Sequence, residues 1–384
     1  MGKIKFKLNS PYLFIYFLSW HVRQVVKIVI DYVIEAQTFY INFYIMTLGM
    51  IIGGLIIYRY QYNSVKHENQ TNYFDLELIY NTTNFVAPDG EYKKLFLIIF
   101  AAFFDFVQFA LDSYFGIVMD KVISPSFDLR VGCLSTIVSS LLCAYTIRFT
   151  TGKHQKISLI ILSLCLIAEI ILEIVLRKKN LVLDKFILAR FLVLLEYIFV
   201  SFDDCVEKYL VEVDFLNPFK LVMFKGIIEL ILSICCSIGK DPFGDVIKLF
   251  KKKDIPKIIG LMFLFLSYFF FSAIVNIYKI YCNVIYTPMA KSLMDYFMTP
   301  FYNIFYYFYA KDFFDNKIYF IESEIISLII DFFGCLYNEF IILFCCGLEH
   351  ETKPEIKIRA SISENNIINE EEEDEASDEK TDDN

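Results

Sequence analysis

The chain has 384 residues, of which 57% are hydrophobic and only 21% are charged, and its mean hydropathy is +0.50. A soluble domain of this size cannot bury so much apolar surface, because most of the area of a folded protein faces its surroundings. The formal charge of −9 comes from one end, since residues 349–384 hold fourteen Asp and Glu against four Lys and Arg. The composition therefore excludes a soluble enzyme and predicts a membrane protein with an acidic tail.

Hydrophobic runs long enough to cross a bilayer recur after a short basic N-terminus at residues 1–10. They predict an all-α integral membrane protein with about ten transmembrane helices in one polytopic domain at residues 11–348. The first run is the weakest, because His21, Arg23 and Lys27 give it a polar side, and it could instead lie in the membrane interface. The predicted spans are Pro11–Ile30, Phe39–Tyr58, Leu95–Val118, Leu129–Phe149, Ile157–Leu176, Phe186–Phe202, Lys220–Ile238, Ile255–Ile277, Asn283–Tyr309 and Ile318–Cys346.

Small residues recur at helical spacing in two of these spans. Gly49 and Gly53 form a GxxxG pattern in the second span. In lipid, close contact between backbones drives helix association, so such stripes predict helix–helix contacts rather than chemical sites. The stripe in the fourth span consists of Gly132, Thr136, Ser140 and Ala144.

One span carries a polar face in its middle. An ionisable residue at the centre of a bilayer costs roughly 2.5–3.5 kcal/mol, so each one requires a reason. Asp105, Gln108 and Asp112 share one helical face of the third span, and their own helix offers no partner for the carboxylates. We expect this face to line a cavity or to meet a cationic group on another helix.

Two later spans each contain a basic and an acidic residue one turn apart. Lys225 and Glu229 have this spacing in the seventh span, and Lys291 and Asp295 have it in the ninth. Such pairs can neutralise each other locally and hold helices in register, or they can belong to a binding cavity. The pattern leaves both interpretations open.

The acidic tail has the composition of a disordered segment. Residues 349–384 include the unbroken acidic run Glu370–Glu375 and no aromatic residue, so they cannot bury enough surface to offset the entropy of ordering. We expect this tail to be disordered. It is either a solvated terminus or a site that recruits a cytosolic partner.

Short motifs along the chain resemble those of the drug/metabolite transporter superfamily, and most closely its nucleotide-sugar-transporter-like branch, solute carrier family 35. The resemblance covers nearly all of residues 11–348, and the order of the motifs is more specific than any one of them. The motifs are Asp128-Leu129-Arg130-Val131-Gly132, Gly152-Lys153-His154-Gln155, Val206-Glu207-Lys208-Tyr209-Leu210, Asn217-Pro218-Phe219-Lys220, Thr287-Pro288-Met289-Ala290-Lys291, Met298-Thr299-Pro300 and Gly334-Cys335-Leu336-Tyr337-Asn338.

The resemblance implies two inverted five-helix repeats, here at about residues 11–176 and 186–348, with a central site that opens to each side in turn. One position departs from the family, because Lys225-Gly226 stands where relatives tend to have Glu-Gly. This reversed charge favours either an anionic solute or an internal ion pair. The candidate cavity residues are Asp105, Gln108, Asp112, Lys225, Glu229, Lys291, Asp295, Tyr337 and Asn338.

The leading hypothesis is a secondary transporter that moves a small polar or anionic solute, such as a nucleotide sugar or related metabolite, by alternating access. It requires no cofactor and no nucleic acid, and four widely separated histidines argue against a metal site. The family arrangement places both termini in the cytosol. We expect the protein in an endomembrane or in the plasma membrane, and a homodimer remains open.

Two other functions remain open. The chain could be a non-transporting membrane adaptor that acts through its acidic tail. A membrane-embedded transferase would need an acid–base set, and only Asp203-Asp204 approaches one. Because adjacent residues point about 100° apart on a helix, they make a poor catalytic pair, and we do not expect an enzyme.

Overall fold

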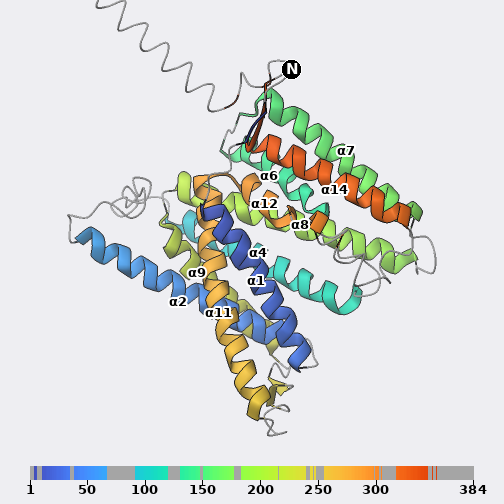
Figure 1. Cartoon of the computed structure of the whole chain (residues 1–384). Coiled ribbons are helices and arrows are strands. Elements are labelled where there is room, and N and C mark those ends of the chain that lie inside the picture. Colours follow the sequence, from blue (N-terminus) through green and yellow to red (C-terminus); the bar gives the residue numbers. More distant parts are fainter. Residues whose placement is uncertain are drawn as a thin grey trace, which may run out of the picture.

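The computed structural model describes residues 4–6, 11–34, 39–66, 91–119, 130–147, 150–176, 183–214, 216–238, 243–244, 246–247, 255–297, 299–301, 304, 317–344, 348 and 352. These residues form ten helices and one short two-stranded sheet (Figure 1). The acidic tail lies outside the described residues apart from Thr352. The all-α class is therefore confirmed for the described part of the chain.

A helix lies at each of the ten predicted spans. Five of them contain segments that are long and apolar enough to cross a membrane, namely α1, α2, α4, α7 and α11. The elements are β1 (Ile4–Phe6), α1 (Pro11–Ile34), α2 (Phe39–Lys66), α4 (Glu91–Met119), α6 (Cys133–Thr146), α7 (Lys153–Leu176), α8 (Leu183–Glu212), α9 (Pro218–Ser237), α11 (Ile255–Ile285), α12 (Pro288–Tyr296), α14 (Lys317–Tyr337) and β2 (Ile341–Leu343).

The helices pack around two hydrophobic cores. One core lies among α1, α2, α9 and α11 and includes Phe43 and Tyr268, which are both fully buried. The other lies among α1, α7, α12 and α14 and includes Leu162 and Ile330. Figure 1 shows α7 and α14 side by side at one end of the molecule, and α11 extending from the other end. Helix α8 joins the two regions, because it packs against both α4 and α6.

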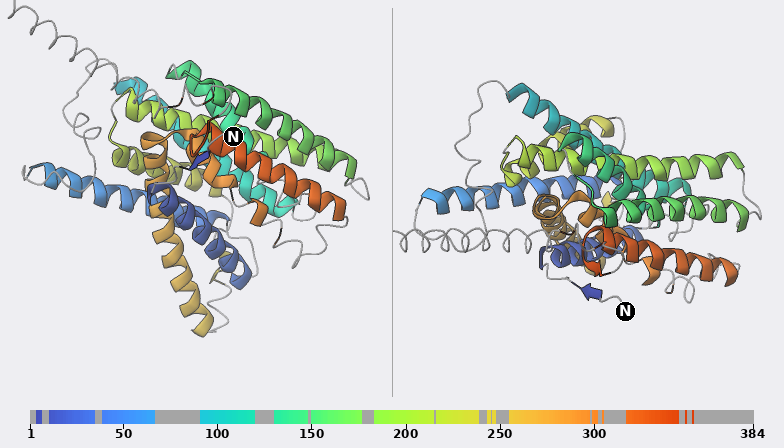
Figure 2. Two further views of the ribbon diagram at one scale, coloured as in Figure 1. Left: turned by 45° about the horizontal axis from the view of Figure 1, so that its top comes forward. Right: turned by 90° about the horizontal axis from the view of Figure 1, so that it is seen from above.

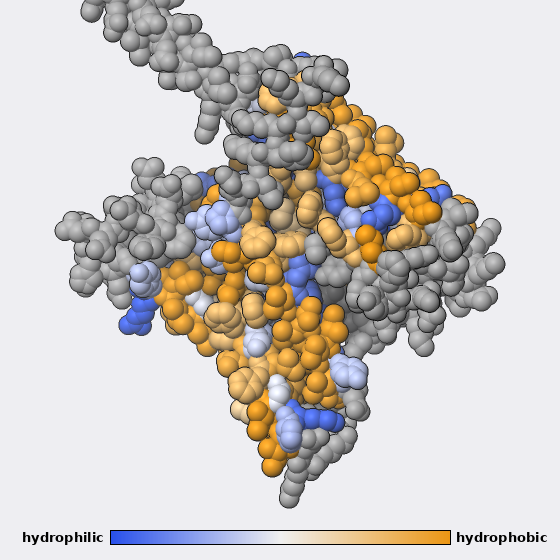
Figure 3. Space-filling view, viewed as in Figure 1, coloured by the Kyte–Doolittle hydropathy of each residue, from blue (hydrophilic) through white to orange (hydrophobic). Residues whose placement is uncertain are grey.

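The outer surface of the helices is apolar. Ile160, Leu164 and Ile171 are exposed on α7, and Phe263 and Leu266 are exposed on α11. Figure 3 shows hydrophobic side chains covering most of the described part of one face. A soluble monomer rarely exposes a contiguous apolar surface of this extent, whereas lipid tails would cover it.

The predicted glycine contact in the second span is confirmed. A Cβ atom on Gly49 would lie 2.8 Å from the carbonyl oxygen of Phe269, so the backbones of α2 and α11 approach closely there. The neighbouring Gly54 makes the same kind of contact with α9, where its Cβ would lie 2.9 Å from the carbonyl oxygen of Phe219. Small residues on α2 thus let two helices approach it closely.

The predicted stripe on α6 is also a helix contact, over part of its length. The Thr136 hydroxyl lies 3.3 Å from the hydroxyl of Tyr296 on α12, and Ser140 accepts a hydrogen bond of 2.8 Å from Tyr337 on α14. Ala144 is exposed, so the contact does not extend to the end of the stripe.

Helix α14 ends earlier than the hydrophobic run predicts. Its last turn closes with Glu339 at a φ of 59°, and the amide of Phe340 donates to the carbonyl of Cys335 at 2.9 Å. This is the hydrogen-bond pattern that terminates many helices. The chain then forms β2, which pairs antiparallel with β1, so the N-terminal strand and the end of the last helix lie on the same side of the molecule (Figures 1 and 2).

Candidate functional site

The helical path is broken between α11 and α12, beside the middle of the fold. Proline lacks the backbone donor that a helix interior needs and disfavours helical geometry in the residue before it. Thr287, which precedes Pro288, is extended at φ −159° and ψ 156°. Its side chain accepts a hydrogen bond from the amide of Ala290 at 3.1 Å and so caps the new helix. The sequence predicted a break before Asn283, and the structure places it a few residues later.

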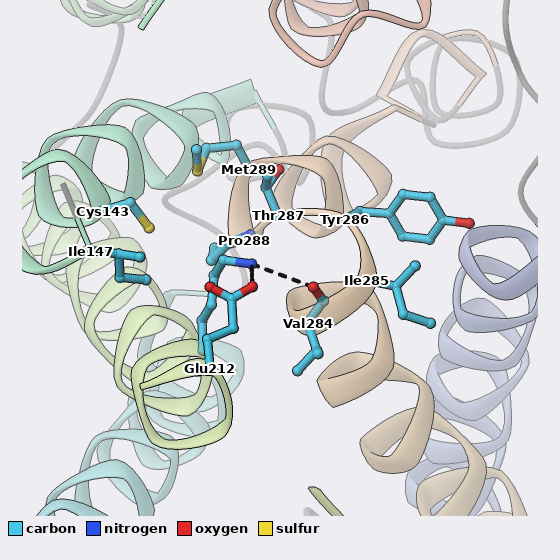
Figure 4. A pocket seen from close by; sticks show the side chains of 10 residues that line it. Cys143, Ile147, Glu212, Val284, Ile285, Tyr286, Thr287, Pro288 and Met289 are labelled. Atoms are coloured by element: carbon cyan, nitrogen blue, oxygen red, sulfur yellow. Dashed lines mark hydrogen bonds and ion pairs between the residues drawn. The ribbon is translucent and has the colours of Figure 1, made fainter. Parts of the chain in front are cut away.

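A cavity of about 300 Å³ lies at this break. Figure 4 shows side chains from α6, α8 and the broken segment around it. Its wall is polar and apolar in about equal parts, and the charged groups in the wall are Lys208 and Glu212 of α8. The lining residues are Cys143, Ile147, Lys208, Glu212, Val284, Ile285, Tyr286, Thr287, Pro288 and Met289.

Lys208 connects helix α8 to the end of α11. Its ammonium group pairs with Glu212 and donates to the backbone carbonyls of Asn283 at 3.0 Å and Val284 at 3.4 Å. The last carbonyls of a helix lack internal partners and carry partial negative charge, so a cation there is favourable. Helix α8 therefore presents groups of both charge signs to the cavity, and these groups pair with each other.

Five helices contribute buried charges to a single network next to the cavity. The network contains five carboxylates and three lysines among the described residues, and we call it the charge cluster. Its members are Asp105 on α4; Asp203, Asp204 and Glu207 on α8; Lys225 on α9; Lys279 on α11; and Lys291 and Asp295 on α12.

Lys225 forms the first centre of the cluster. Its ammonium nitrogen lies 2.8 Å from Asp105, 2.9 Å from both oxygens of Asp203 and 2.6 Å from Glu207. An ammonium group has three hydrogen-bond donors, so these carboxylates saturate it. The cationic partner that the face of Asp105 predicted is therefore Lys225, from another helix.

Lys279 and Lys291 extend the cluster toward α12 and α1. Lys279 pairs with Asp203 and lies 3.6 Å from Asp204. Lys291 lies 3.1 Å from Asp204 and 2.9 Å from Asp295, which also accepts a hydrogen bond of 2.8 Å from the hydroxyl of Tyr16. The predicted Lys291–Asp295 pair is confirmed.

The sequence identified about half of this arrangement. Asp105, Lys225, Lys291 and Asp295 belong to the charge cluster. The Lys225–Glu229 pair does not form, because Lys225 turns to other helices and Glu229 has no hydrogen-bond partner among the described residues.

The remaining predicted residues have other surroundings. Gln108 is half-buried on α4, and the side chain of Asp112 lies outside the described residues. Tyr337 bonds to Ser140 of α6, as described above. Asn338 follows α14 and reaches the broken segment, where its amide nitrogen lies 3.4 Å from the carbonyl of Met289.

The sequence indicated Asp203 and Asp204 only as a poor catalytic pair, and neither Glu207 nor Lys279 was among the candidate cavity residues. The predicted sixth span ended at Phe202, whereas α8 continues to Glu212. The available signal was the spacing of Asp203, Asp204 and Glu207, which places all three on neighbouring faces of one extended helix. Although adjacent residues diverge on a helix, Asp203 and Asp204 both come within ion-pair distance of Lys279.

The three carboxylates of α8 also lie close enough together to be considered as metal ligands. Their oxygens lie within 4.8 Å of one another. Lys225 and Lys279, however, already contact oxygens of Asp203 and Glu207. We therefore assign these carboxylates to ion pairs with lysine.

No protein-family model matches this chain, and no curated protein matches it.

Proposed function

We propose that this chain is a secondary transporter that moves a small polar solute across a membrane by alternating access. The carrying observation is the charge cluster, to which five helices contribute, beside a cavity of about 300 Å³ at the junction of α11 and α12. Ionisable residues inside a membrane domain mark solute and ion pathways, and transporters place their binding sites between two repeats.

The pattern of helix contacts supports two inverted repeats. We match α1, α2, α4, α6 and α7 in order with α8, α9, α11, α12 and α14. The most extensive contacts then have counterparts, whereas the smaller contacts of α11 with α8, α9 and α12 have none of similar extent among the described residues. The contact of α1 with α11 corresponds to that of α8 with α4, and the contact of α2 with α11 corresponds to that of α9 with α4. Moreover, α2 packs on α9, α6 on α12 and α7 on α14, so three helices contact their own counterparts.

Such an arrangement is what two halves related by a pseudo-two-fold axis produce. It supports assigning all ten helices to one transporter domain of the drug/metabolite transporter type, nucleotide-sugar-transporter-like in its motifs. The pairing of β1 with β2 is consistent with both ends of that domain facing one side, which we propose is the cytosol.

The cavity determines the class of solute in this proposal. Lys225 and Lys291, the two lysines among the candidate cavity residues, each already contact carboxylates. The charged groups in the cavity are Lys208 and Glu212, of opposite sign, and they pair with each other in this conformation. We therefore place the solute at the helix break and favour one that is polar and carries both a donor and an acceptor.

A stability screen tests this proposal. The purified protein is heated with nucleotide sugars, nucleotides, phosphorylated metabolites, amino acids and amines. A ligand of the folded state at a hundredfold excess over its Kd stabilises by about 2.7 kcal/mol, which raises the melting temperature. We expect at least one selective ligand, whose effect disappears in Lys208→Met and in Glu212→Gln.

The matched control is Lys257→Gln. Lys257 is exposed on the same helix as the break, at the opposite end and about 40 Å from Val284. It should leave the ligand effect unchanged. If a ligand stabilises the cavity variants as strongly as the wild type, the solute does not bind in this cavity.

A further inference from the structure

Glu229 differs from every carboxylate of the charge cluster in having no partner among the described residues. It lies on α9, one helical turn from Lys225, and its residue exposure is 0%. Neither of its two carboxyl oxygens has a hydrogen-bond partner among the described residues. A buried carboxylate in this situation cannot remain ionised cheaply, and such groups become neutral instead.

The surroundings of Glu229 contain carboxylates and lysines in equal number. The charged groups that interact with it are Asp105 of α4, Lys225 of its own helix, Asp203 of α8 and Lys279 of α11. On α2, which packs against the neighbouring Gly226, the contacts are the uncharged residues Thr47, Met50 and Ile51.

Those two lysines are already engaged by the carboxylates of the cluster. Lys225 contacts three of them, and Lys279 lies within 4 Å of four. The cluster as a whole has five carboxylates for three ammonium groups. An ionised Glu229 would add a sixth negative charge, with no cation available to it among the described residues.

We propose that Glu229 is a proton-binding site, protonated in this conformation, and that its proton is the ion coupled to solute movement. The first part depends on the burial and contacts of Glu229. The second part also rests on the proposed function. When the transporter opens to the other side, water can reach the carboxyl group, the proton leaves, and Lys225 becomes the nearest cation for the carboxylate.

Infrared spectroscopy of the reconstituted protein tests the protonation without any solute. A protonated carboxylic acid has a carbonyl stretch that is resolved from carboxylate and amide bands and shifts when its proton is exchanged for deuterium. The difference spectrum between wild type and Glu229→Gln at neutral pH should contain this band. Glutamine has the shape of the neutral acid, so the variant should fold, and Glu229→Asp should move the band rather than remove it.

The matched control is Glu212→Gln, because Glu212 is ion-paired with Lys208 and should contribute no such band. The proposal is overturned if the wild type and Glu229→Gln have the same spectrum in this region. It is also overturned if Na⁺ at fixed pH removes the band, since the site would then bind a metal cation. Neither result depends on finding a solute, so the failure of this inference is distinguishable from the failure of the proposed function.

Discussion

Lys225 is the residue on which most of the buried charge depends. Its ammonium group joins carboxylates from α4 and α8 while its backbone belongs to α9, so one side chain links three helices. Removing one member of a buried ion-paired network leaves uncompensated charge, which typically costs 3–5 kcal/mol. Lys225 therefore holds three helices together, independently of any part in the proposed transport.

We predict that Lys225→Gln lowers the unfolding free energy by about 3–5 kcal/mol, because Asp105, Asp203 and Glu207 lose their shared cation. Thermal unfolding of the purified protein measures this. The control is Lys220→Gln on the same helix, where the lysine lies over the ring of Phe224 and the loss should be below about 1 kcal/mol. Equal losses in the two variants would show that the ion pairs contribute nothing specific.

The sequence partly showed which single residues matter, but it did not show how they pair. Asp105 and Lys291 stood out because a charge inside a hydrophobic run is costly. Their contacts with Lys225 and Asp204 join residues far apart along the chain, and helical spacing carries no information about such contacts. The local rule therefore predicted Lys291–Asp295 correctly and assigned Lys225 to the wrong carboxylate.

At the scale of elements, hydrophobic runs located the helices and misjudged their ends. Helix α8 extends to Glu212 because its last turns are buried among other helices and use charged side chains there. Helix α14 stops at Tyr337 although apolar residues follow, because the backbone closes through Glu339 and continues as a strand. Hydropathy predicts which residues contact lipid, but contact with lipid does not determine where α8 and α14 end.

The contacts of α2 yield a prediction with a chemically identical control. We predict that Gly54→Ala destabilises the protein by about 1–3 kcal/mol, because the new methyl group would lie 2.9 Å from the carbonyl oxygen of Phe219 on α9. Gly260→Ala on α11 places its methyl group in open space, with no atom within 4 Å. It should stabilise its helix by up to about 1 kcal/mol.

Melting temperatures of the two alanine variants, measured in the same detergent, provide the comparison. If Gly54→Ala melts at or above the temperature of Gly260→Ala, the close contact between α2 and α9 is not present in the folded protein.

At the scale of the whole molecule, the apolar exterior and the buried charge cluster have opposite requirements. The exterior suits lipid, whereas eight charged residues, six of them buried, gather where five helices meet. The composition predicted that the exterior would be apolar. The correspondence that we propose between the two sets of five helices was not visible in the residues, because it rests on the pattern of helix contacts and the two halves share no obvious sequence repeat.

Alternating access is the central claim, and the cavity at the helix break is where it is best tested. Thr287 lines the cavity at the start of α12. We would place a single cysteine there, as Thr287→Cys in a background without the ten native cysteines, and reconstitute the variant in sealed vesicles. A control cysteine at Lys153, at the start of α7, should be reached from one side only.

The measurement is labelling of Thr287→Cys by a membrane-impermeant thiol reagent added to one side or the other. If access alternates, Thr287→Cys is labelled from each side, and a solute identified in the stability screen slows labelling on both sides. Labelling from one side only, or from neither, while the Lys153 control is labelled normally, would contradict it and would favour a membrane protein that does not transport.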